Sequence, residues 1–176
     1  MATSNDKSLR ATRLVFYKDD IDSINAVLDA FLKQSAAKCA LLVDKDGHMV
    51  TCRGTSKSID LDTISALVAG SFAATREMAR LLGEEEFTAL FHQGKSDNIQ
   101  LSLVGERALL TAIFDENTTV GMVRLYASEA AKRLAAVFRR KETDAASEPP
   151  PPAQSGEETA TFRSGAASAL DGLFGK

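Results

Sequence analysis

One stretch has the spacing of a nucleotide-binding loop. "ALFHQGKS", residues 89–96, fits a relaxed phosphate-loop pattern with alanine in the first glycine position. Such a loop surrounds phosphate with backbone N–H groups, and the helix after it points its N-terminus at the anion. Here Leu90 and Phe91 are strand-type residues, and the following "NIQLSLVG" alternates like a strand. We therefore interpret the stretch as a hairpin turn and expect no cofactor. A nucleotide-binding enzyme that uses Lys95 is the weaker alternative.

Two further patterns suggest metal chemistry. "DKDG", Asp44–Gly47, resembles the start of a calcium loop, which needs another acid at its third ligand position and a glutamate at position twelve. Those positions hold His48 and Thr55, so we interpret the tetrapeptide as a turn. His48 and His92 have no Cys, Asp or Glu at metal-ligand spacing in the sequence. We predict no metal site.

The two cysteines, Cys39 and Cys52, flank this turn. They lie opposite each other if the turn has two residues, whereas a bulge at Gly47 shifts the register. We interpret them as reduced, small, core-facing thiols. No nucleophile has a matching base motif around it. The sequence therefore predicts no catalytic residue, and we expect a protein that is not an enzyme.

The elements that position these residues follow from hydrophobic periodicity and turn signals. Short turns separate the last three strands, and Gly83 stops the long helix. The order α-β-β-α-β-β-β-α predicts an α+β fold. The expected elements are a helix over 19–34, a hairpin over 39–54, a helix over 59–82, strands within 87–94, 98–105 and 107–115, and a helix over 118–141.

Charge and composition divide the chain into a folded part and two ends. Residues 142–176 hold six acids and two bases, a balance of −4, so the rest carries +1 of the net charge of −3. A near-neutral body does not form a phosphate-binding surface, and we expect no nucleic acid partner. Without an apolar run of about 18 residues, we expect no membrane span and a cytoplasmic location. We predict a disordered N-terminus over 1–13, a domain over 14–141 and a disordered Pro/acid-rich linker over 142–160.

The long helix carries a feature that an ordinary surface helix lacks. Its core face gathers Leu61, Ile64, Val68, Phe72, Ala79 and Leu82, with Leu67 and Met78 at the edge. The opposite face should be charged. Instead its middle is Ala66, Ala69, Gly70, Ala73 and Ala74, with Glu77 where charge returns. Because small residues let another backbone approach closely, we predict intermolecular packing there. A helix covered by its own chain, or an alanine-rich surface, is the alternative.

The order of elements and five stretches resemble the Roadblock family. These stretches run almost without a gap from about Val15 to Phe138: "INAVLDAFLK", "LLVDKDGHMV", "LVAGSFAATREMARLLGEEEF", "FHQGKSDNIQLSLVG" and "AIFDENTTVGMVRL". The resemblance implies a five-stranded antiparallel sheet with the long helix on one face and two helices on the other. It also implies a homodimer whose sheets join edge to edge, with the two long helices side by side.

The resemblance further implies a partner, a small Ras-like GTPase of the MglA type, bound over the paired helices. The protein would accelerate GTP hydrolysis and act in bacterial cell polarity or gliding motility, with enrichment at a cell pole. The GTPase would supply the catalytic groups itself. A scaffold that binds a GTPase or another protein without accelerating hydrolysis is the alternative. Arg76 and Glu77 depart from the continuous run of small residues that family members can carry on this helix.

The chain ends in a short segment, residues 161–176, with apolar residues at helical spacing. A short helix would place Ala167, Leu170, Leu173 and Phe174 on one side. Alone it is too short to be stable in water, so we expect it to fold in a partner's groove. The linker keeps the segment near a GTPase already bound by the dimer, so we predict a second contact with the GTPase through Leu170, Leu173 and Phe174. A tail that packs on its own domain or does nothing is the alternative.

Overall fold

The computed structural model describes residues 18–55 and 59–147, with side chains up to Arg140. Contacts within the chain separate residues up to Glu142 from Thr143 onward, and the fold below is that of the first unit. The expected segments 1–13 and 161–176 lie outside the described residues, as does the linker from residue 148. The domain limits therefore stay predictions.

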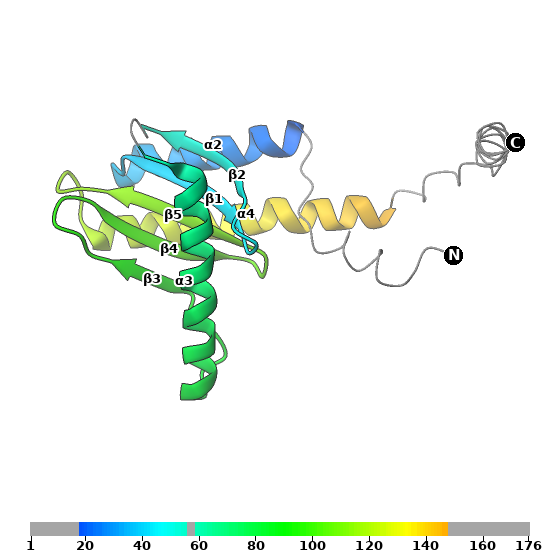
Figure 1. The fold of residues 1–176 in the computed structure, drawn as a ribbon. Helices are drawn as coiled ribbons and strands as arrows, with labels where there is room; N and C mark the ends of the chain where they lie inside the picture. The colour runs from blue at the N-terminus through cyan, green and yellow to red at the C-terminus, as the bar shows by residue number, and fades with distance from the viewer. Residues whose placement is uncertain (1–17, 56–58, 148–176) are drawn as a thin grey trace, which may run out of the picture. The chain divides into compact units, whose positions relative to one another are not determined.

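One antiparallel sheet of five strands forms the middle layer (Figure 1). The strands lie in the order β2-β1-β5-β4-β3, so β2 and β3 are the edges. Leu, Ile and Val dominate the central strands, as expected for strands covered on both faces. The strands are β1 (Cys39–Asp44), β2 (Met49–Gly54), β3 (Ala89–His92), β4 (Asn98–Val104) and β5 (Ala108–Phe114).

Three helices cover the two faces. The long helix α3 (Leu61–Leu82) crosses one face, while α2 (Lys18–Ser35) and the part of α4 (Val120–Ser147) up to Glu142 cover the other (Figure 1). Alternation along the strands fills both layers: Ala40 and Leu42 pack towards α2 and α4, whereas their neighbours in β1 pack towards α3. The expected element order, sheet and helix placement are confirmed.

One detail differs from the sequence-based expectation. The helix expected to end at Lys141 continues to Ser147, because "ETDAAS" contains helix-forming residues and nothing opposes helix before Pro149. The first six residues expected in the linker are thus helical. The hairpin register, which the sequence left open, contains a bulge, since it changes between Leu42 and Val43.

Candidate functional site

The helix α3 has well-defined ends. Asp60 caps it by accepting the backbone N–H of Thr63 at 3.1 Å and the Thr63 hydroxyl at 2.6 Å. These hydrogen bonds hold the pKa of the Asp60 carboxyl below its ordinary value. At the other end Gly83 adopts φ 75°, a left-handed conformation, and its N–H returns to Arg80 O. The face that α3 presents is therefore fixed by its own caps.

Most of the predicted small-residue face is exposed. Ala66, Gly70, Ala73, Ala74 and Glu77 all face outwards on α3. This exposed set is called the small-residue face below. The expectation was wrong for Ala69, which is only 7% exposed and belongs to the core. Ala69 follows Val68, and the wheel places it too near the edge of the buried stripe to remain exposed.

Gly70 has no packing role within the protomer. A Cβ atom built there would meet nothing within 4 Å. Glycine nevertheless costs a helix interior about 1 kcal/mol relative to alanine. Nothing in the free protomer offsets this cost. The glycine therefore favours close approach by another molecule. Ala66 is different, because a Cβ at Gly47 in the β1–β2 turn would lie 3.0 Å from its Cα. The protein's own turn thus approaches one end of the face.

The C-terminal part of α3 carries exposed large apolar residues. α3 runs from β1 and β2, where Leu61 and Ile64 pack, past Phe72 on Leu101, and then beyond edge strand β3 (Figure 1). Met78 is 49% exposed, Leu81 73% and Leu82 72%. These three residues are called the overhang. The assignment of Leu82 to the core face was wrong, because the sheet ends before it, and Leu67, expected at the core edge, is 64% exposed.

The two arginines of α3 lie beside carboxylates. Arg80 donates to the Glu77 carboxylate through Nε at 3.0 Å. Arg76 Nε lies 3.8 Å from Glu86 Oε1. The ion pair with Glu77 raises the pKa of Arg80. Both arginines of α3 therefore have carboxylate partners within the protomer, and Arg76 and Glu77 place charge beside the overhang.

The stretch that resembles a phosphate loop is a hairpin, as predicted. Residues Ala89–His92 form β3 and pair with β4, and β4 begins at Asn98, where a phosphate loop would need a helix. Gly94 donates its N–H to Asn98 Oδ1 at 3.3 Å, and a Cβ there would overlap the carbonyl oxygen of Asp97. Its glycine serves a tight turn.

The "DKDG" segment is also a turn. One ligand atom each from Asp44, Asp46 and His48 lies within 4.8 Å of the others, so His48 is not alone in space, contrary to the sequence expectation. However, Asp44 Oδ1 accepts the N–H groups of Asp46 at 3.0 Å and His48 at 2.8 Å, and Oδ2 lies 3.2 Å from His48 Nδ1. The carboxylate is thus engaged in holding the turn.

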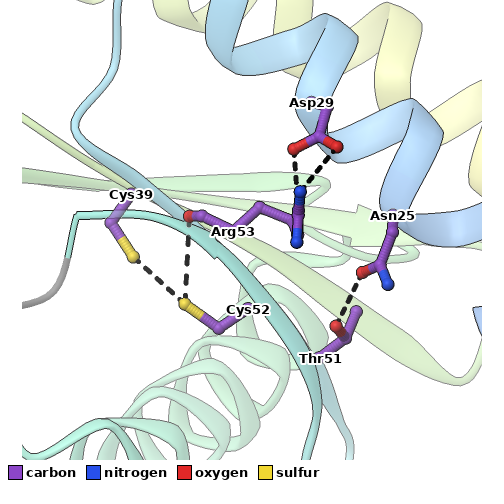
Figure 2. Close-up of polar contacts among 6 residues, drawn as sticks. All are labelled: Asn25, Asp29, Cys39, Thr51, Cys52 and Arg53. Carbon is purple, nitrogen blue, oxygen red and sulfur yellow. Dashed lines mark hydrogen bonds and ion pairs between the residues drawn. The ribbon is translucent and has the colours of Figure 1, made fainter.

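The two cysteines lie close together without being opposite each other. Cys39 faces Gly54 across the ladder and Cys52 faces Leu41. Both side chains point to the α3 side of the sheet, and their Sγ atoms are 3.4 Å apart (Figure 2). Among the described residues Cys39 is buried, as expected, while Cys52 is half-buried.

The terminal segment with Ala167, Leu170, Leu173 and Phe174 lies outside the described residues, so its contacts stay a prediction. The overhang is what sequence reasoning missed. The signal was present in Leu81, which lies outside the apolar stripe and beside Leu82 at the helix end. Two adjacent leucines in the last turn of a helix cannot both face the same sheet.

Comparisons with known proteins agree with this fold. Residues 23–114 match the model of the Roadblock/LC7 domain. The gliding protein MglB of Thermus thermophilus has a similar structure, with 35% identity, a TM-score of 0.69, and coverage of 72% of this chain and 96% of that one. Myxococcus xanthus MglB is 39% identical, with a TM-score of 0.64 over 66% and 95% of the two chains.

A Roadblock/LC7 domain from Streptomyces avermitilis shares the fold at 14% identity, with a TM-score of 0.59 over 65% of this chain and 96% of that one. The family model covers more than half of the chain, and the MglB structures match nearly their whole length. The layered sheet, the long helix and these matches together assign the chain to the Roadblock/LC7 family.

Proposed function

We propose that the protein is a homodimeric regulator of a small Ras-like GTPase of the MglA type and accelerates GTP hydrolysis. The observation that carries the proposal is the small-residue face of α3, which is exposed and has a glycine that the protomer does not need. The similarity to two MglB proteins supports the same role, in bacterial polarity or motility.

The overhang supports the homodimer. Three large apolar side chains project past β3, and exposed apolar surface of this kind marks an interface. β3 pairs only with β4 in the described part of the chain, so its outer edge is open to a second sheet. A mate joined at this edge would cover Met78, Leu81 and Leu82 with its own sheet. The dimer then brings two long helices together as one surface.

The proposed mechanism is a population shift in the GTPase. Phosphoryl transfer needs a positioned water, magnesium and a positive group near the transferred phosphate. The two α3 arginines have carboxylate partners, and the one charged residue of the small-residue face, Glu77, is paired with Arg80. Packing on this face would favour the hydrolysis-competent arrangement of the GTPase, which contributes the catalytic groups itself.

The test uses Gly70→Arg in a single-turnover GTPase assay with the cognate GTPase. The side chain fits the protomer, since the position is open, so we expect a folded dimer without activation. Ala26→Arg, at an exposed alanine of α2, is the matched control and should retain activation. Full activation by Gly70→Arg would make the surface assignment wrong. Binding by the unaltered protein without acceleration would select the scaffold alternative.

We further propose that the segment 161–176 makes a second contact with the bound GTPase through Leu170, Leu173 and Phe174. Its spacing of apolar residues and the acidic linker before it support this role. Deleting 161–176 should leave the dimer intact and change GTPase affinity or nucleotide exchange. If neither quantity changes, the segment has no such role.

The proposed place of action is the cytoplasm, with enrichment at a cell pole. None of the helices in the described ranges is long and apolar enough to cross a membrane. Fluorescence microscopy of a tagged chain, with and without its GTPase, tests the enrichment at a cell pole. An even distribution in both conditions would contradict it.

A further inference from the structure

The two cysteines meet under the start of α3. Their Sγ atoms are 3.4 Å apart, and both side chains belong to the cluster with Leu41 and Val43 (Figure 2). The same cluster receives Ile59, Leu61 and Ile64 from the start of the long helix. A change at the thiols therefore acts directly on the residues that pack beneath the start of α3.

The backbone around the pair is held close by a glycine. Gly54, opposite Cys39, has φ 95°, and a Cβ there would overlap the carbonyl oxygen of Lys38 and lie 3.0 Å from Cys39 Cα. No side chain fits between the strands at this point. The N–H of Thr55 also donates to Lys38 O at 2.8 Å. The end of β2 is thus drawn against the beginning of β1, which brings Cys52 towards Cys39.

The other face of β2 is fastened to α2 (Figure 2). Thr51 donates to Asn25 Oδ1 at 2.7 Å, and Arg53 donates to both Asp29 oxygens at 2.7 and 2.9 Å. Strand alternation sends Thr51 and Arg53 to one face and Cys52 to the other. Edge strand β2 is therefore held from the far side while Cys52 faces its neighbour thiol.

The two thiols differ in reactivity. Cys39 is fully buried, and burial, with the Cys52 hydrogen bond second, raises the pKa of its thiol to about 12. Cys52 is half-buried and reaches solvent. Since the thiolate is the nucleophile, Cys52 is the group that meets an oxidant first, and Cys39 is placed to react with it afterwards.

We propose that Cys39 and Cys52 form an oxidation-sensitive site. A peroxide oxidises the two thiols, which then join in a reversible disulfide. Cys52 Sγ attacks one peroxide oxygen, the O–O bond breaks, and Cys52 becomes a sulfenic acid as the first water leaves with its proton. Cys39 Sγ then attacks Cys52 Sγ, the S–O bond breaks, and the released hydroxide takes the Cys39 proton as a second water. Two thiols are oxidised and one peroxide is reduced.

The register of β1 and β2 should make this disulfide easy to reduce. Diagonal neighbours in an antiparallel pair have Cα atoms about 7–8 Å apart. A relaxed disulfide spans about 4.4–6.8 Å between Cα atoms. Closing the bond therefore pulls β2 along β1, and a distorted disulfide is readily reduced. The shift reaches Leu61 and Ile64, so oxidation should alter GTPase binding, an effect that rests on the proposed function.

The first experiment detects the bond in the full chain. Protein treated with hydrogen peroxide is digested with trypsin under non-reducing conditions. The expected product joins peptide 39–45 to peptide 46–53 through Cys39 and Cys52, and dithiothreitol separates them. Cys39→Ser should leave Cys52 as a sulfenic acid that a dimedone probe captures. Two free thiols after treatment, or bonds only between chains, would overturn the proposal.

The second experiment measures the effect on α3. Reduced and oxidised protein are compared for GTPase affinity, with the double variant Cys39→Ser/Cys52→Ser as the control. We expect a change of about three-fold or more for the unaltered protein, on the scale of distributed coupling effects, and none for the variant. Equal affinities would remove the regulatory role. No binding by the reduced protein would instead contradict the proposed function, while the linked peptides would still test the bond.

Discussion

Helices α2 and α3 cover opposite faces of one sheet, but only α2 is completed by its own protomer. Ile24, Leu28 and Phe31 of α2 are at most 1% exposed, its other large apolar residues are partly buried, and polar contacts join this helix to β2. In contrast, α3 leaves Met78 49% and Leu82 72% exposed where it extends beyond the sheet. Both helices have amphipathic sequences. The difference teaches that an apolar stripe longer than the sheet beneath it indicates a second chain.

The largest expected effect on assembly comes from charging the overhang. The pair Leu81→Asp and Leu82→Asp would place carboxylates in a dimer interface, where burial of an unpaired charge is costly. We expect the dimer to dissociate at least about 100-fold more readily, the effect of about 3 kcal/mol. Sedimentation or light scattering over a range of concentrations measures this. Leu125→Asp on α4, where the leucine is 54% exposed, is the control and should remain dimeric.

For buried core residues we expect the same loss of stability on substitution in α2 and in α3. Phe72 in α3 is 2% exposed and Phe31 in α2 is 1% exposed. Each Phe→Ala change should lower the free energy of unfolding by about 3–5 kcal/mol, because it removes buried area and leaves a cavity. Urea unfolding at one protein concentration measures both. A much smaller loss for Phe72→Ala would mean that the α3 layer is loosely packed inside as well.

A reciprocal exchange of small residues sharpens the comparison. Gly70→Ala should raise the free energy of unfolding by about 1 kcal/mol, because alanine is the better helix former and its methyl group meets nothing. Ala26→Gly in α2 should lower it by a similar amount. Thermal unfolding measures both changes. A loss of stability with Gly70→Ala would show that a dimer mate already occupies this position.

The smallest effect concerns the polar link between α2 and β2. Hydrogen bonds from Arg53 hold the pKa of the Asp29 carboxyl below its ordinary value. Their contribution is present above that ordinary value, about 3.9, and is lost as pH falls through the lowered one. Asp29→Asn should therefore be less stable near neutral pH, and the gap should close on acidification. Asp22→Asn on the same helix is the control. A difference in stability between Asp29→Asn and the unaltered protein that persists in acid would exclude the ionised Asp29 carboxylate as its cause.

Hydrophobic period, Gly83 and the strand-type runs are local signals, and they predicted the order of elements and most of the small-residue face. The five-stranded antiparallel sheet was expected from the resemblance to the Roadblock family. The sequence did not predict that Leu82 is exposed or that Ala69 is buried. Both depend on where the sheet lies under the helix, which no periodicity encodes. The sequence left the pairing of Cys39 and Cys52 open, and it did not predict the bulge between Leu42 and Val43 that helps to set their register.

The overhang also has a dynamic consequence. In the last turn of α3, residues 78–82, only Ala79 is buried, and the hydrogen bonds of this turn are held mainly by the helix itself and the Gly83 cap. Local opening of such a segment needs far less free energy than global unfolding. In a lone protomer the amides of residues 78–82 should exchange with deuterium much earlier than those of 64–72, and assembly should slow them. The rate of amide hydrogen exchange at the C-terminal end of α3 then reports directly on dimer assembly.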